Sequence, residues 1–196
     1  RSQRSNQRGP LFEPAAFFPS TILGLMALTY GSIVSFLPLF AVKRGLANPG
    51  LFFSVFAVVL ILSRGPAGRI SDRYGRGATV IPGLVLAAMG LGLLSTAGSV
   101  VAFLGVALLY GLAFALVQPS LMALMVDSVS PGRRGAAMGT FTAAMDLGIG
   151  GGSFLWGFVA QAAGFPLMYQ AAAVIALVAL AAFVTGSRKR APRPSP

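Results

Sequence analysis

The sequence predicts an all-α membrane protein, a bundle of six transmembrane helices. Of its 196 residues, 56% are hydrophobic and only 10% are charged, whereas soluble domains carry roughly 25% charged residues. The apolar residues form runs approaching or exceeding the roughly 20 residues that a helix needs to cross a hydrocarbon core of about 30 Å. The runs are continuously apolar, which does not fit a membrane β-barrel, whose strands alternate apolar and polar side chains.

Six runs define the predicted spans. They cover residues 14–42, 49–63, 78–97, 100–126, 135–163 and 166–186. The second is the shortest, because Arg64 interrupts its apolar stretch. Asn48-Pro49 and Ser130-Pro131 place a capping side chain before a proline, a pattern typical of helix starts. The predicted organisation is therefore a linker segment (1–13), a six-helix bundle (14–186) and a basic tail (187–196).

The basic residues predict the orientation of the spans. The formal net charge is +11, and all but Lys43 and Arg44 of the 15 Lys and Arg residues fall on one side of the predicted membrane. Cytoplasmic connections carry such an excess, so both termini are expected to be cytoplasmic in a multi-pass protein of the plasma (inner) membrane. Topology explains the charge, so the lipid bilayer is an expected partner and nucleic acid is not.

The composition argues against an enzyme. The chain has no Cys and no His, and its acidic residues are Glu13, Asp72, Asp127 and Asp146. The commonest zinc ligands, the usual general base and a Ser-His or Cys-His nucleophile are therefore missing. No cofactor or metal site is expected.

A signature pattern lies between the second and third spans. It reads Gly-x-x-x-Asp-Arg-x-Gly-Arg and is formed by Gly68, Asp72, Arg73, Gly75 and Arg76. The pattern resembles the cytoplasmic signature loop of the major facilitator superfamily, although Gly77 stands where that family usually has a last basic residue. The resemblance implies a conformational role, in which an Asp and Arg cluster latches helices together and stabilises one access state. The alternative is an ordinary positively charged loop.

Two further segments resemble the same family. Asp127, Pro131, Arg133, Arg134 and Gly135 resemble its loop between the fourth and fifth helices of a half. The stretch from Glu13 through Pro38 is similar to its seventh helix. The resemblance implies the C-terminal six-helix half of a transporter, with a three-plus-three inverted repeat and an N-terminal half as its partner.

The fifth span contains a carboxylate inside an apolar run. A charge there costs on the order of 2.5 to 3.5 kcal/mol on insertion scales, so Asp146 should face a cavity or a partner. Thr142, Asp146, Gly150 and Ser153 share one face at helical spacing, while Gly148 and Gly152 lie on another face that suits close helix packing. Asp146 either contacts substrate or a proton, or forms a structural hydrogen bond.

Other polar residues form weaker stripes. In the fourth span Tyr110, Phe114 and Gln118 align beside Pro119, and in the first span Thr29 and Ser32 align. A polar amide beside a proline kink is what a midplane binding site can use. The alternative is simple packing between helices. Arg64 is a further pathway candidate, with interfacial anchoring as its alternative.

The leading functional hypothesis follows from the resemblance. It implies secondary active transport of a small solute by alternating access, with proton-coupled efflux as the expected mode. Two other hypotheses remain open: a six-helix protein that pairs with itself to form the pathway, and a membrane scaffold or sensor that does not transport.

Overall fold

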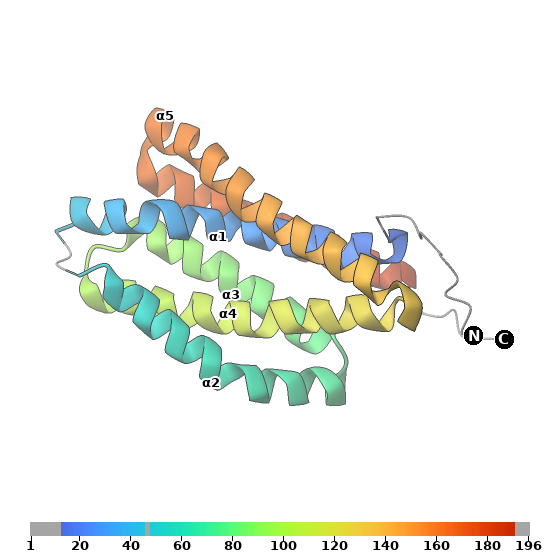
Figure 1. Cartoon of the computed structure of the whole chain (residues 1–196). Helices are drawn as coiled ribbons and strands as arrows, with labels where there is room; N and C mark the ends of the chain where they lie inside the picture. Colours follow the sequence, from blue (N-terminus) through green and yellow to red (C-terminus); the bar gives the residue numbers. More distant parts are fainter. Residues whose placement is uncertain (1–12, 46–47, 191–196) are drawn as a thin grey trace, which may run out of the picture.

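A computed structural model describes residues 13–45 and 48–190 of the chain, and only the helix path of residues 189 and 190. The helices are α1 (Phe17–Lys43), α2 (Gly50–Tyr74), α3 (Gly77–Thr96), α4 (Val100–Asp127) and α5 (Arg134–Arg190). Short 3-10 turns at Pro14–Ala16 and Pro131–Arg133 precede α1 and α5. The helices lie side by side as one elongated bundle (Figure 1). Most of the predicted linker (residues 1–12) and the end of the tail (191–196) lie outside the described residues.

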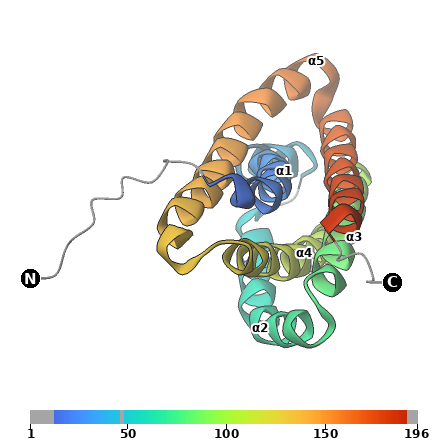
Figure 2. The same ribbon diagram turned by 90° about the vertical axis from the view of Figure 1, so that its right-hand side faces the viewer.

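The long helix α5 is interrupted at one glycine. It contains 57 residues, and Gly164 within it adopts φ 80° and ψ 168°, a left-handed conformation that favours glycine. The chain reverses there, and Figure 2 shows the two limbs of α5 on different sides of the bundle. Residues 134–163 are called the first limb and residues 165–190 the second limb. With α1 to α4, the two limbs match the six predicted spans.

Helix α2 is longer than the sequence predicted. Its predicted span ended at Ser63, but the helix continues through Arg64 and Pro66 to Tyr74. Hydropathy locates the end of the apolar run, whereas helical backbone hydrogen bonds continue wherever the chain allows them. The prediction that Gly68, Asp72 and Arg73 lie in a connecting loop was therefore wrong, because all three lie in the last turns of α2.

The two predicted helix starts, Asn48-Pro49 and Ser130-Pro131, differ in whether the side chain before the proline forms a cap. Asn48 Oδ1 accepts a hydrogen bond of 3.0 Å from the Gly50 amide at the start of α2, but the helix begins one residue later than predicted, with Pro49 instead of Asn48 directly before it. Ser130 precedes the turn before α5 with no side-chain cap. Here the proline fixes the backbone by its own ring, and the serine hydroxyl is not needed.

Glycine packing joins α1 to the first limb of α5. A Cβ added at Gly148 would lie 2.6 Å from the Gly24 carbonyl oxygen, and one at Gly152 would collide with the backbone of Leu28. The predicted packing role of Gly148 and Gly152 is thus confirmed. Trp156 Nε1 adds a hydrogen bond of 2.8 Å to the Leu28 carbonyl. Backbone contact of this kind is how helices associate without a hydrophobic driving force.

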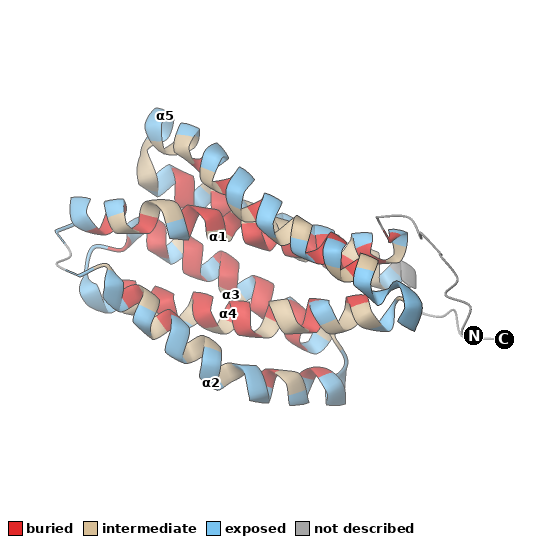
Figure 3. Ribbon diagram, in the orientation of Figure 1, coloured by how far each residue is buried: buried red, intermediate tan, exposed pale blue. Residues whose placement is uncertain are grey.

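The outer surface is strongly apolar on α2 and on the first limb of α5. Ile61 and Leu62 are 71% and 70% exposed, and Leu147 and Phe154 are 75% and 73% exposed. Pale blue residues mark these two helices in Figure 3. Exposed apolar area on this scale requires lipid or another membrane domain as its neighbour.

Candidate functional site: an arginine hub and a polar surface

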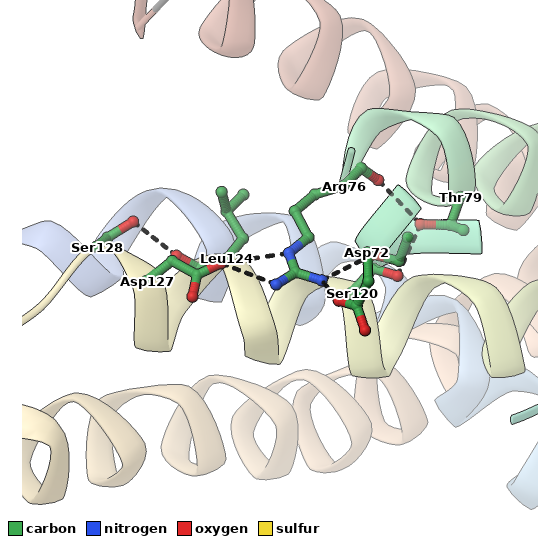
Figure 4. Close-up of polar contacts among 8 residues, drawn as sticks. Asp72, Arg76, Thr79, Ser120, Leu124, Asp127 and Ser128 are labelled. Carbon is green, nitrogen blue, oxygen red and sulfur yellow. Dashed lines mark hydrogen bonds and ion pairs between the residues drawn. The ribbon is translucent and has the colours of Figure 1, made fainter. Parts of the chain in front are cut away.

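Most basic residues of the bundle gather at one end, here called the arginine-rich end, where α2 and α4 end and α1, α3 and α5 begin. Arg76, the residue before α3, forms a hub at this end (Figure 4). Its Nε and Nη2 donate to Asp127 Oδ2 at 3.3 and 3.0 Å. Its Nη1 donates to Ser71 Oγ at 3.2 Å and to Asp72 Oδ1. One guanidinium thereby connects the ends of α2 and α4 at the start of α3.

The local sequence places Arg76 in this position. Gly75 ends α2 with φ 86°, a left-handed conformation that a side chain rarely adopts. The turn needs only this glycine and Arg76 before α3 begins, so the guanidinium stays close to the α2 carboxylate. One turn into α3, Thr79 and Ser120 of α4 share a buried hydrogen bond of 2.7 Å, which fixes α3 against α4 beside the hub.

The hub stays charged at any physiological pH. Partial burial disfavours the charged guanidinium, but hydrogen bonds to Asp72 and Asp127 outweigh that effect, so the pKa of Arg76 is raised above its usual value. The two predicted segments, one after the second span and one after the fourth, therefore meet through a permanent cation. The predicted pairing of Asp72 with a neighbouring Arg is confirmed.

A second ion pair lies at the same end of the bundle. Arg133 Nη1, in the turn before α5, is 3.0 Å from Glu13 Oε2, without the geometry of a hydrogen bond to that oxygen. Glu13 directly precedes the turn into α1 and is buried. The contact joins the beginnings of α1 and α5, two helices that the hub does not touch.

The other members of the two predicted segments lie at the periphery. Arg73 is exposed and stacks over the ring of Tyr74, 5.4 Å from its centroid. Arg134 and Gly135 are exposed at the start of α5. Gly68 does not mediate a close helix approach, since nothing lies within 4 Å of the position of its absent Cβ. Gly68 therefore faces away from the neighbouring helices, whereas Ala67 and Ser71 of the same helix are buried.

Gln118 is the centre of a second polar cluster, which lies between the two ends of the bundle. Its Oε1 accepts a hydrogen bond of 3.2 Å from Arg64 Nη2 on α2, and its Nε2 lies 3.5 Å from Met145 Sδ on α5. The single amide thus connects three helices. The sequence had placed Arg64 at the boundary of a connection, but Arg64 lies in the interior of α2.

Tyr110, Thr29 and Ser32 are packed inside the bundle. All three are buried, the Thr29 and Tyr110 hydroxyls are 2.8 Å apart, and Ser32 Oγ donates to the Thr29 carbonyl at 2.6 Å. Their hydrogen bonds are satisfied between α1 and α4. This arrangement favours the packing interpretation of these residues over direct contact with a solute.

Aromatic rings cover the outer side of this packed layer. Tyr30 stacks on Phe56 with centroids 5.7 Å apart and lies 5.1 Å from Phe114. Tyr30 is only half-buried, and Phe114 lies one helical turn from Gln118 on α4. The three rings, from α1, α2 and α4, form an aromatic wall beside the Gln118 cluster.

Asp146 lies on the open side of the first limb of α5. Asp146 and Thr142 are exposed, as is Gly150 one turn further on. Ser153 is half-buried and its Oγ accepts a hydrogen bond of 2.8 Å from Ser35 of α1. Within the described part of the chain, the structure shows no ion pair for Asp146. The stripe predicted from helical spacing therefore divides, with Ser153 turned toward α1.

Comparison with known proteins decides the family. The sequence pattern of the Major Facilitator Superfamily matches residues 19–196. The chain belongs to this superfamily. An uncharacterised MFS-type transporter from Pseudomonas aeruginosa is 35% identical over 167 residues, which are 85% of this chain and 42% of that protein. The staphylopine export protein of Staphylococcus aureus is 27% identical over 89% of this chain and 44% of that protein.

Solved structures of transporters share the fold of this chain. A crystal structure of the peptide transporter POT in complex with sulfate matches 89% of this chain and 38% of its own with a TM-score of 0.78 at 23% identity. The major facilitator chain described here thus spans less than half the length of the relatives that it matches. It is a multi-pass membrane protein, and its superfamily comprises transporters, not enzymes.

Two features of this superfamily member were not evident in its sequence. The sequence singled out Gln118 but not its bond to Arg64, a residue 54 positions earlier, and it gave no sign of the aromatic wall. Helix α2 continues past Arg64 and through Pro66. Allowing the predicted helix to continue past the arginine would have placed Arg64 inside α2. Contacts between residues far apart in the sequence can be identified only when the packing of the helices is known.

Proposed function

We propose that the full-length protein containing this chain performs secondary active transport of a small solute by alternating access, driven by protons and directed outward. The observation that supports this proposal is the position of Asp146. A carboxylate within a membrane span, exposed and without an ion pair among the described residues, is a functional group by default in membrane proteins. It can bind a proton in one state and a cationic group of the solute in the other.

The proposal includes a second six-helix half. The chain covers 42 to 44% of two relatives, and α2 and the first limb of α5 present exposed apolar side chains on the outside of the bundle. A second half packed on these helices would enclose a pathway beside Gln118 and Asp146. Pairing of two copies of this chain is the alternative arrangement, and it leaves the same helices at the contact.

We propose that the protein lies in the plasma membrane with its arginine-rich end facing the cytoplasm. Both chain termini are proposed to lie on that side. The Arg76 hub then acts as a latch. It holds α2, α3 and α4 together in this conformation, and the Glu13 and Arg133 pair holds α1 to α5. The two Arg76 pairs have exposed carboxylates and can break at modest cost, as a conformational cycle requires.

The test replaces the proposed proton carrier. Full-length protein with Asp146→Asn, in proteoliposomes with an imposed pH gradient, should lose gradient-driven accumulation of its solute but keep downhill exchange. The matched control is Asp72→Asn, which also removes one carboxylate. It should slow transport through the latch without changing its dependence on pH.

The results separate the alternatives. Unchanged proton coupling in Asp146→Asn would show that another group carries the proton. If neither Asp146→Asn nor Gln118→Ala altered any transport phenotype, the scaffold or sensor hypothesis would replace the transporter proposal.

A further inference from the structure

A charged cluster at one depth of the bundle has a use beyond proton coupling. Arg64 lies ten residues before the end of α2 at Tyr74, Gln118 nine before the end of α4 at Asp127, and Asp146 twelve after the start of α5 at Arg134. These separations correspond to roughly 15, 14 and 18 Å along their helices. All three ends belong to the arginine-rich end, so the three residues lie at similar distances along the bundle axis from that end.

Arg64 is poorly explained as a structural residue. A guanidinium at this depth is expensive unless it faces a water-filled cavity or a partner. Among the described residues, the only hydrogen bond or ion pair that the structure shows for the Arg64 side chain is the hydrogen bond of 3.2 Å to Gln118 Oε1, and Arg64 is exposed. A guanidinium has five donors, so most of them remain available to a ligand.

Gln118 holds the cation beside the carboxylate-bearing helix. Its amide bonds Arg64 through Oε1 and meets Met145 through Nε2, and Asp146 directly follows Met145. An anion-binding group and a cation-binding group therefore occupy helices on either side of one amide. In the aromatic wall next to them Phe56 and Phe114 are buried, so the half-buried Tyr30, which packs on both rings, supplies the accessible apolar surface.

We infer that the Gln118 cluster binds a zwitterionic solute that carries an apolar group, with its carboxylate on Arg64 and its ammonium on Asp146. A planar guanidinium suits a carboxylate because the two can form paired hydrogen bonds. Asp146 would then exchange the ammonium for a proton, which couples the two movements. This inference rests on the proposed transport function and adds the chemical class of the solute.

The experiment measures thermal unfolding of the full-length protein in detergent with three probes that share the phenylalanine side chain. L-phenylalanine carries both charges, phenylalaninamide only the positive one and N-acetylphenylalanine only the negative one. A ligand that binds the folded state raises the unfolding temperature in proportion to its affinity. L-phenylalanine should bind about tenfold more tightly than either derivative, since each lost charged contact is worth about that factor.

Variants assign the two charges. Arg64→Gln should bind L-phenylalanine and phenylalaninamide equally, because the carboxylate subsite is gone, while Asp146→Asn should remove the preference over N-acetylphenylalanine. Gln118→Glu provides a second test without deleting Arg64, because its carboxylate would pair with the guanidinium and weaken carboxylate binding. Arg69→Gln, an exposed arginine on the same helix, is the matched control and should bind all three probes as the unmodified protein does.

Three results would overturn the inference. The first is a derivative that binds the unmodified protein as tightly as L-phenylalanine, and the second is no binding of L-phenylalanine at all. The third is an Arg64→Gln protein that still prefers the free carboxylate. None of these results affects the Asp146→Asn test of proton coupling, so failure of the solute class is distinguishable from failure of the transport mechanism.

Discussion

At the scale of single residues, Arg76 has more structural consequences than any neighbouring charge. Replacing it with Gln removes both ion pairs of the hub, to Asp72 and Asp127. Both carboxylates are more than half exposed, and exposed pairs contribute at most about 1 kcal/mol each. We therefore expect a loss of stability of about 1 kcal/mol, but a larger population of molecules in which the arginine-rich ends of α2 and α4 separate.

The chain provides a clean measurement of that separation. Residues 1–196 contain no Cys, so once any Cys of the second half is replaced, spin labels at Tyr74→Cys and Ser128→Cys, both exposed positions, report only the distance between the ends of α2 and α4. Arg73→Gln removes an equal charge without touching the hub and is the control. An Arg76→Gln protein with an unchanged distance distribution would show that the hub is not a latch.

Single residues also mark the limit of sequence analysis. The pattern around Asp72 was sufficient to suggest that it pairs with a neighbouring Arg, because arginines lie within a few positions of it in the sequence, and the structure shows that its partner is Arg76. The bond from Arg76 to Asp127 spans 51 positions, and nothing in either segment encodes the other. Packing of α3 against α4 creates that bond.

At the scale of helices, the contact between α1 and the first limb of α5 depends on absent side chains. Gly148→Ala would place a methyl group 2.6 Å from the Gly24 carbonyl oxygen. Backbone atoms cannot turn aside as a flexible side chain can, so the helices must separate. We expect a loss of stability of about 1 to 3 kcal/mol, the usual cost of overpacking, seen as a lower unfolding temperature in detergent.

The same helix offers its own comparison. Gly150→Ala meets no atom within 4 Å and, in the interior of a helix, should be neutral or slightly stabilising because alanine favours the helix. Equal unfolding temperatures for the two variants would mean that α1 and α5 are not in backbone contact. The packing of Gly148 and Gly152 could be predicted from their shared helix face. The end of α2 could not, because its apolar run ends at Ser63 whereas the helix continues to Tyr74.

At the scale of the whole molecule, the six spans and the family pattern were predictable because hydrocarbon imposes a length and a polarity on every crossing. The surroundings of the bundle were not. Asp146 could be expected to face a cavity or a partner, but only the structure places it outside its own bundle, on the side where another membrane domain or a solute must complete its environment. The core of a membrane bundle and its interface with another membrane domain have similar amino-acid compositions, so composition alone does not distinguish the two locations.

Orientation is the property of the whole molecule that a simple experiment can decide. If arginine keeps its end of the bundle in the cytoplasm, a single cysteine at Ala162, beside the Gly164 reversal, should react with a membrane-impermeant maleimide on intact cells. One at Ser128, at the arginine-rich end, should react only after the membrane is permeabilised. Both positions are exposed and residues 1–196 have no Cys, so only Cys residues of the second half need replacing, and reaction after permeabilisation controls for reactivity. Labelling of Ser128→Cys on intact cells would reverse the proposed orientation and place the Arg76 latch on the outer face.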